Sequence, residues 1–179
     1  MPDLEELYRE IILDHYRSPR NRGELEAPPA HRVEGFNPLC GDEVVLTPLV
    51  EDGTLADIKI GGTGCSISQS SASLMSAAVK GQPVEAVRRL IATFKDMMSI
   101  HRASLGEGAE DEGGVAGGSS GLSPGPETLD GEPEEVDLSK LGELAALQGV
   151  VKFPVRIKCA VLSWNALAQG LDEVAAGAA

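Results

Sequence analysis

The chain has few cysteines, three in 179 residues, and an odd number cannot all pair within one molecule. A small secreted scaffold held together by disulfides is therefore excluded. In a reducing compartment such thiols are either inert core residues or metal ligands. The N-terminal segment also lacks the basic stretch and the apolar stretch of a secretion signal, so we expect a cytoplasmic protein.

Basic residues are scarce as well: 15 Lys and Arg stand against 28 Asp and Glu, a net charge of −13. This balance argues against nucleic acid and anionic membrane surfaces as partners, because both require clustered Lys and Arg. No apolar run approaches the roughly 18 residues of a membrane span. Aromatic residues make up only 3% of the chain, so the core must consist mainly of Leu, Val, Ile and Ala.

One segment carries most of the negative charge. Residues 106–137 contain ten Asp or Glu and no Lys, Arg or His, among many Gly, Ser and Pro. This composition buries too little apolar surface to offset the entropy lost on ordering, so we expect a flexible acidic insert that acts as a solvating linker. The whole chain, 1–179, is predicted to be a single domain interrupted by this insert.

Hydrophobic spacing and turn signals predict helices and strands on both sides of the insert. The first helix covers 3–17, with an Asp3–Glu6 capping box at its start and His15 interpreted as a surface or capping residue. The Gly-rich run 61–64 is expected to end the third strand. Strands are predicted at 31–36, 43–50 and 55–60, the last two joined by a hairpin turn. Further helices are predicted from about 65 to 80, from Pro83 onward, at 138–147, and from Pro154 to about 174.

The three cysteines occupy positions that suit metal binding. Cys40 and Asp42 flank Gly41 in a predicted turn, where glycine lets the backbone fold tightly enough for both side chains to face one ion. Cys65 follows three glycines at a predicted helix start, where the helix dipole favours a thiolate. Cys159 lies on the apolar stripe of the last helix. Three sulfurs and one carboxylate suit tetrahedral zinc or one edge of an iron–sulfur cluster, although spacing alone leaves open that the cysteines are buried apolar residues.

Four segments resemble, in order and spacing, the U-type iron–sulfur cluster scaffold family (IscU and SufU). They are LYREIILDHYRSPRNRG, NPLCGD, GGTGCSISQSSASLM and FPVRIKCAVLSWNAL. The resemblance covers nearly all of the chain except the insert. It implies an α+β fold, a small antiparallel three-stranded sheet with helices packed on one side and a metal site at one end. The family's site residues fall on Cys40, Asp42, Cys65 and Cys159.

The residue before the third cysteine distinguishes the two branches of the family. The IscU branch has a His there, whereas this chain has Lys158, and together with the insertion before the last helix this resembles SufU. The SufU branch implies a zinc ion held by the four site residues and a SufS-type cysteine desulfurase as sulfur donor. Arg156, three residues before Cys159, is interpreted as an exposed charge; the alternative is contact with a persulfide or with the partner enzyme.

These features predict an iron–sulfur cluster assembly protein that accepts persulfide sulfur and serves downstream carriers or client proteins. Such a protein is sulfurtransferase-like rather than an ordinary enzyme. Cys40 is the predicted acceptor because a loop residue leaves a metal most easily; Cys159 is the runner-up by analogy with the IscU branch. One alternative is a scaffold for a transient [2Fe–2S] cluster or iron, with Asp42 as a weak oxygen ligand. The other is a structural zinc domain without sulfur chemistry, although such sites are typically all Cys and His.

Overall fold

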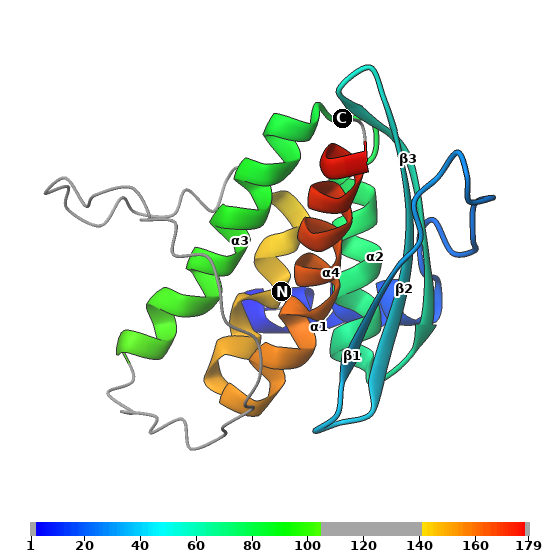
Figure 1. The fold of residues 1–179 in the computed structure, drawn as a ribbon. Coiled ribbons are helices and arrows are strands. Elements are labelled where there is room, and N and C mark those ends of the chain that lie inside the picture. Colours follow the sequence, from blue (N-terminus) through cyan, green and yellow to red (C-terminus); the bar gives the residue numbers. More distant parts are fainter. Residues whose placement is uncertain (1–2, 105–140, 178–179) are drawn as a thin grey trace, which may run out of the picture.

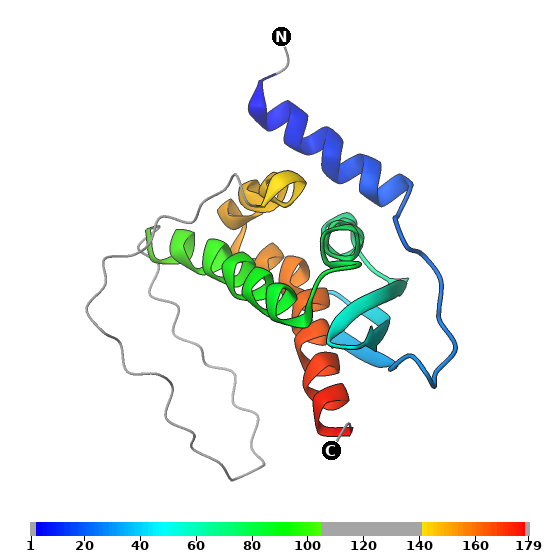
Figure 2. The same cartoon turned by 90° about the horizontal axis from the view of Figure 1, so that it is seen from above.

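The computed structural model describes residues 3–104 and 141–177. Figure 1 shows a three-stranded sheet with helices packed on one side, so the predicted α+β class is confirmed. Helices α2 and α4 lie against the sheet, and α1, α3 and η2 pack outside them (Figure 2). The elements are α1 (Leu4–Arg17), β1 (Val33–Asn37), β2 (Asp42–Glu51), β3 (Thr54–Thr63), α2 (Ser66–Val79), α3 (Val84–Ser104), η2 (Gly142–Lys152) and α4 (Pro154–Gly177).

The sheet has the order β1-β2-β3, and both pairs of strands are antiparallel. The predicted hairpin is confirmed: Asp52 and Gly53 join β2 to β3, with φ of 48° and 74°. Positive φ at both turn residues gives the twist that the flanking strands require. The expectation that the Gly-rich run ends β3 is wrong. Gly61 and Gly62 stay paired with β2, because partner strands decide pairing more than intrinsic propensity does.

Helix α2 is built of small residues, which lets its neighbours approach closely. Its buried serines find partners instead of remaining unpaired. Ser71 Oγ donates to the Ala160 carbonyl at 2.6 Å and accepts from Trp164 Nε1 at 3.1 Å. The Trp164 ring stacks on Phe94 with 4.2 Å between centroids. Trp164 is fully buried and packs in a core that is otherwise mostly aliphatic.

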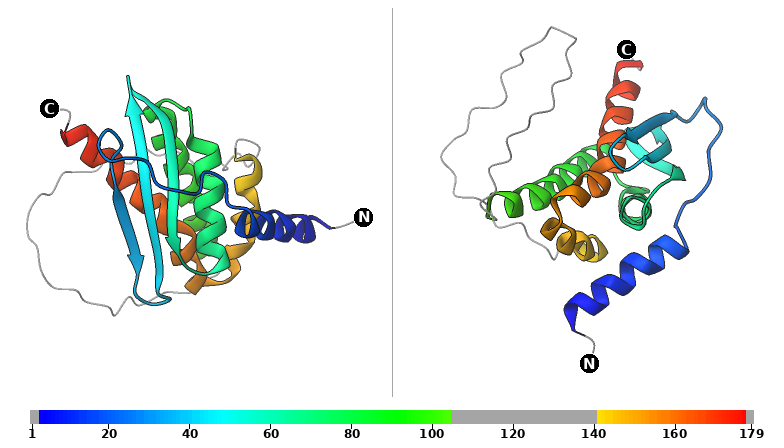
Figure 3. Two further views of the ribbon diagram at one scale, coloured as in Figure 1. Left: turned by 90° about the vertical axis from the view of Figure 1, so that its right-hand side faces the viewer. Right: turned by 90° about the horizontal axis from the view of Figure 1, so that it is seen from below.

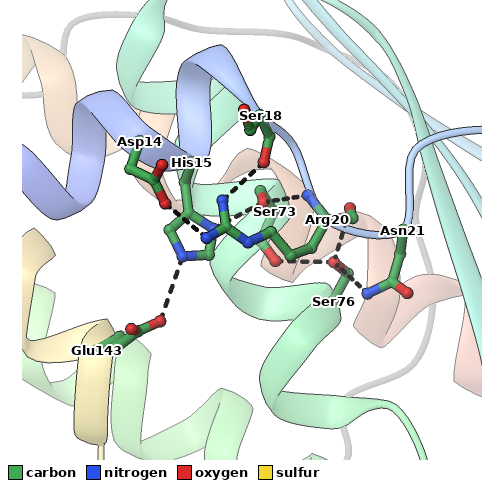
Figure 4. Close-up of polar contacts among 8 residues, drawn as sticks. All are labelled: Asp14, His15, Ser18, Arg20, Asn21, Ser73, Ser76 and Glu143. Carbon is green, nitrogen blue, oxygen red and sulfur yellow. Dashed lines mark hydrogen bonds and ion pairs between the residues drawn. The ribbon is translucent and has the colours of Figure 1, made fainter.

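Helix α1 is attached to the helical layer by polar contacts (Figure 4). His15 is only 2% exposed. Its Nδ1 lies 2.7 Å from Ser73 Oγ of α2, and its Nε2 lies 3.3 Å from a Glu143 carboxylate oxygen of η2. Ser73 Oγ also accepts from the backbone N–H of Arg20 at 2.8 Å. The interpretation of His15 as a surface or capping residue is wrong, because this face of α1 packs between α2 and η2.

The region after the insert differs from its prediction. A 3₁₀ helix, η2, spans Gly142–Lys152 where a short helix over 138–147 was expected. The first predicted residues of that helix and the acidic insert 106–137 lie outside the described residues. The final helix begins at Pro154 as predicted and extends to Gly177. Within the described part of the chain, none of the helices combines the length and apolarity needed to cross a bilayer.

The insert can be tested by replacement. Exchanging residues 106–137 for a short Gly/Ser linker should change the melting temperature by no more than a few degrees, since this composition offers little apolar surface for packing. Thermal unfolding followed by circular dichroism measures the effect, with the full chain as reference. A loss of most of the thermal stability would mean that the insert packs on the core and is part of the domain.

Candidate metal centre

The four predicted site residues lie together at one end of the molecule. The β1–β2 turn, the start of α2 and the start of α4 meet there, at the bottom of Figure 1 and facing the reader in the right-hand view of Figure 3. Cys40 Sγ lies 3.1 Å from Asp42 Oδ2 and 3.2 Å from Cys159 Sγ. Cys65 Sγ lies 3.5 Å from Asp42 Oδ2. Three separate segments of sequence thus bring three sulfurs to one carboxylate.

The β1–β2 turn presents Cys40 to solvent. Gly41 has φ of +68°, and its N–H donates to the Asn37 carbonyl at 2.9 Å, which closes the turn. The Asn37 side chain organises the same turn: its Oδ1 accepts from Leu39 N–H at 3.1 Å, and its Nδ2 donates to Cys40 Sγ at 2.9 Å. Asn37 was not among the predicted site residues, although Asn at the start of the NPLCGD turn is a recognisable signal for this geometry.

Asp42, at the start of β2, contacts all three cysteines of the centre. Its side chain is 1% exposed. Burial by itself raises the pKa of a carboxyl group, but hydrogen bonds from the Cys65 N–H and from the neighbouring thiols outweigh it, and the pKa of Asp42 falls below its ordinary value. Gly64 makes room for this carboxylate, because a Cβ there would stand 2.7 Å from Asp42 Oδ1 and 2.5 Å from Ser68 Oγ.

Cys65 is the N-cap residue of α2, as its position after the glycines predicted. Its backbone N–H donates to Asp42 Oδ1 at 2.9 Å, and its Sγ accepts from the Ser68 N–H at 3.5 Å. A helix N-terminus stabilises negative charge, so this position suits an anionic sulfur ligand.

Cys159 and Arg156 form the α4 side of the centre. Cys159 is buried, and this burial, with hydrogen bonds to Cys40 and Asp42, raises the pKa of its thiol well above the ordinary value. Electrostatic interaction with Cys65 and hydrogen bonding to Cys159 raise the pKa of the Arg156 guanidinium. Arg156 is exposed, as interpreted, and it also faces the thiols. The spacing from Arg156 to Cys159, close to one helical turn, was the available signal for this contact.

The donor set fits a zinc ion. Zinc–sulfur bonds of about 2.3 Å in a tetrahedral arrangement put ligand atoms about 3.8 Å apart. The candidate ligand atoms of Cys40, Asp42 and Cys159 all lie within 4.8 Å of one another. Cys65 lies outside that group; its sulfur contacts Asp42 Oδ2 at 3.5 Å and accepts from the Ser68 N–H. The assignment of all four residues as ligands of one ion stays a prediction.

Comparisons with known proteins identify the family. The family model of the NifU-like N terminal domain matches residues 7–112. A solved structure from Fervidobacterium islandicum AW-1, named as an iron–sulfur cluster assembly scaffold for the SUF system, superposes with a TM-score of 0.67. It is 28% identical and covers 94% of this chain and 99% of its own. Fold and candidate centre thus define the class: a U-type protein with a NifU-like N-terminal fold.

Two relatives align over almost the entire chain. The zinc-dependent sulfurtransferase SufU of Bacillus subtilis (strain 168) is 38% identical over 98% of this chain and 96% of its own length. The iron–sulfur cluster assembly scaffold protein IscU of Streptococcus pyogenes serotype M1 is 33% identical over 96% of this chain and 87% of its own. The chain belongs to the NifU-like N-terminal family and is a SufU/IscU-type protein of iron–sulfur cluster assembly.

Proposed function

We propose that this chain is a zinc-binding sulfur acceptor that takes persulfide sulfur from a SufS-type cysteine desulfurase. The observation that carries the proposal is the position of Cys40. Of the chain's three cysteines, Cys40 is exposed, Cys65 is half-buried and Cys159 is buried. Cys40 projects from a turn at the edge of the centre, where the persulfide of a partner enzyme can reach it. The name of the B. subtilis relative, a zinc-dependent sulfurtransferase, supports the same assignment.

The transfer is a thiol–persulfide exchange. Bound zinc would keep the coordinating sulfurs as thiolates near neutral pH. The Cys40 thiolate attacks the terminal sulfur of the desulfurase persulfide, and a new S–S bond forms at Cys40. The S–S bond of the desulfurase breaks, and its cysteine leaves as a thiolate with the bonding electron pair. Electrons balance without an added oxidant or reductant, and the desulfurase is ready for another turnover.

Neighbouring residues prepare Cys40 for this step. The Asn37 Nδ2–H group that donates to Cys40 Sγ stabilises negative charge on that sulfur. The Arg156 cation, on the same exposed end, would favour an anionic persulfide. Cys159 is the runner-up acceptor, but it is covered by the centre and must be uncovered first. Exposure of Cys40 also disfavours a purely structural zinc domain, whose site is closed.

A second candidate function is a scaffold on which a [2Fe–2S] cluster is the cargo. The observation that favours it is the mixed donor set, because one carboxylate beside three thiols holds a cluster less firmly than four thiols do. Relatives named as IscU scaffolds in S. pyogenes and Thermotoga maritima also align over more than nine-tenths of this chain. Anaerobic incubation with ferrous iron and sulfide tests it: a scaffold develops the visible absorption of a [2Fe–2S] cluster.

The proposed function is tested by metal analysis joined to a desulfurase assay. Protein purified without oxygen should contain about one zinc ion per chain. Adding it to a SufS-type desulfurase with cysteine should increase sulfide release in the presence of a reductant. Protein that holds no zinc and leaves sulfide release unchanged would overturn the proposal.

Asp42 provides a further prediction. In Asp42→Ala three thiolates remain, and thiolate binds zinc more tightly than carboxylate does. We expect this variant to retain zinc against a chelator at least as long as the unmodified chain. It should accept sulfur about tenfold more slowly, because it lacks the weakest zinc ligand, whose release from the ion makes the centre accessible.

Asp42→Asn is the matched control. Its side-chain oxygen can still accept from the Cys65 N–H, which the alanine variant leaves unpaired. If both variants lost zinc rapidly, Asp42 would be an essential ligand instead of the labile one.

A further inference from the structure

The sulfurs of Cys40 and Cys159 lie close enough to react with each other. Their Sγ atoms are 3.2 Å apart, and both residues carry free thiols. A disulfide bond is about 2.05 Å long, so the two sulfurs need to approach by only about 1.2 Å to form one. The pair joins two distant parts of the sequence, the β1–β2 turn and the start of α4, which meet at the bottom of Figure 1.

The two thiols differ in what can reach them. Cys40 is exposed on its turn, whereas Cys159 is buried. Asp42 Oδ2, at 3.1 Å, and Cys159 Sγ occupy the inner side of Cys40 Sγ. A sulfur atom delivered by a partner enzyme therefore arrives on the outer, solvent side. Cys159 then faces the opposite end of the new S–S bond, the direction from which a thiol displaces a sulfur leaving group.

We propose that Cys159 is a resolving thiol, which attacks Cys40 Sγ in the Cys40 persulfide and expels the accepted sulfur as hydrogen sulfide. The inference rests on the proposed function, which loads that sulfur onto Cys40. An S–S bond forms between Cys159 and Cys40 while the bond from Cys40 Sγ to the outer sulfur breaks. The outer sulfur leaves with the bonding electron pair and takes up the Cys159 proton. It is therefore the oxidant: it is reduced to sulfide as the two cysteines become a disulfide.

Position selects Cys159 for this role over the other thiol of the centre. Within the part of the chain that the structure describes, Cys40 Sγ contacts the Cys159 sulfur and not the Cys65 sulfur, which lies 3.5 Å from Asp42 Oδ2. A group held at contact distance acts at an effective concentration far above that of a dissolved thiol. The internal attack should therefore be faster than attack by thiols in solution.

The disulfide has two further consequences. It removes two of the predicted sulfur ligands, so zinc should be released together with the sulfide. Its Cys40 sulfur remains on the exposed turn, where a dithiol reductant can attack it and restore both thiols. The chain would thus release sulfide at the centre and depend on a dithiol to accept sulfur again.

The test is a single turnover without oxygen and without reductant. The zinc-loaded chain is incubated with a SufS-type desulfurase and an equal amount of cysteine, and the desulfurase alone gives the background. A sample quenched directly after transfer should carry the added sulfur on Cys40. On standing, about one sulfide and about one zinc ion should be released per chain, and peptide mapping should find a Cys40–Cys159 disulfide. Omitting cysteine should leave both thiols reduced.

Cys159→Ser should keep the persulfide on Cys40 and release less than about a tenth of the sulfide, because a hydroxyl cannot replace the attacking thiol. Cys65→Ser is the matched control, since it also removes a predicted sulfur ligand, yet it should still end as the Cys40–Cys159 disulfide. Circular dichroism shows whether each variant folds. If Cys159→Ser does not fold, the disulfide map of the unmodified chain decides alone.

The outcomes separate this inference from the proposed function. A persulfide that persists on Cys40 of the unmodified chain without sulfide release would overturn the resolving role and leave the acceptor role standing. Sulfur found on Cys159 would also overturn it, because the attack would then fall on the outer sulfur. An unmodified chain that takes no sulfur from the desulfurase would overturn both.

Discussion

Replacing Cys40 with serine should abolish sulfur acceptance while the fold survives. A serine hydroxyl is not ionised near neutral pH, so it cannot replace the thiolate that attacks a persulfide. We expect the activation of a SufS-type desulfurase to fall by about two orders of magnitude or more. Cys40 is exposed on a turn, and the change of one atom leaves the buried residues Asp42 and Cys159 in place. The melting temperature of the metal-free protein should therefore change little.

Cys159→Ser is the informative comparison. It alters the runner-up acceptor, which is buried, so that variant should lose stability and zinc before it loses acceptance. After a single turnover, mass spectrometry of the unmodified chain should find the added sulfur atom on Cys40. If Cys40→Ser activated the desulfurase as well as the unmodified chain does, the acceptor role would pass to Cys159, or the domain would be structural.

Local signals in the sequence were sufficient for most of the fold. The Asp52–Gly53 hairpin, the α1 cap at Asp3 and the start of α4 at Pro154 all lie where their turn and cap chemistry predicted. The Asp3 carboxylate accepts from the Glu6 N–H at 2.8 Å, as a capping box requires. Each of these features depends on residues a few positions apart, so the chain itself carries the information.

Features that depend on distant partners were not predictable in this way. His15 is buried between Ser73, 58 residues away, and Glu143, 128 residues away. Its two ring nitrogens lie within hydrogen-bond distance of the side-chain oxygens of these residues. The spacing within α1 puts His15 on the same face as Ile11, four residues earlier, but it does not reveal the distant polar partners. The lengths of β3 and η2 were missed for the same reason, since pairing with β2 and packing against α1 and α4 set them.

The candidate centre was predicted by motif and only partly by chemistry. Spacing alone left three cysteines that were either core residues or ligands, and the four matching segments identified Cys40, Asp42, Cys65 and Cys159 as a set. The structure adds the residues that support this set. Gly64 leaves space for a carboxylate, a role that becomes visible only once β3 and α2 lie against Asp42.

Gly62→Ala should be the most destabilising single change near the centre. Gly62 has φ of +105°, which side chains with a Cβ rarely adopt, and a Cβ there would stand 2.2 Å from the Glu43 carbonyl oxygen. Both effects act on backbone, which cannot rotate away as a side chain would. We expect a loss of about 3 kcal/mol in the free energy of unfolding, roughly 10 °C in Tm. Because Glu43 adjoins Asp42, zinc affinity should fall as well.

Gly61→Ala is the neighbouring control. A Cβ at Gly61 would meet nothing nearer than 3.8 Å, and its φ is not among the positive values, so this variant should stay within about 1 kcal/mol of the unmodified chain. Thermal unfolding of both variants with zinc and after chelation separates the effect on the fold from the effect on the centre. Gly62→Ala should lose stability in both conditions, because its strain lies in the sheet. If its melting temperature equalled that of Gly61→Ala, β3 would approach β2 less closely than the structure describes, and Gly62 would have no special role beside the centre.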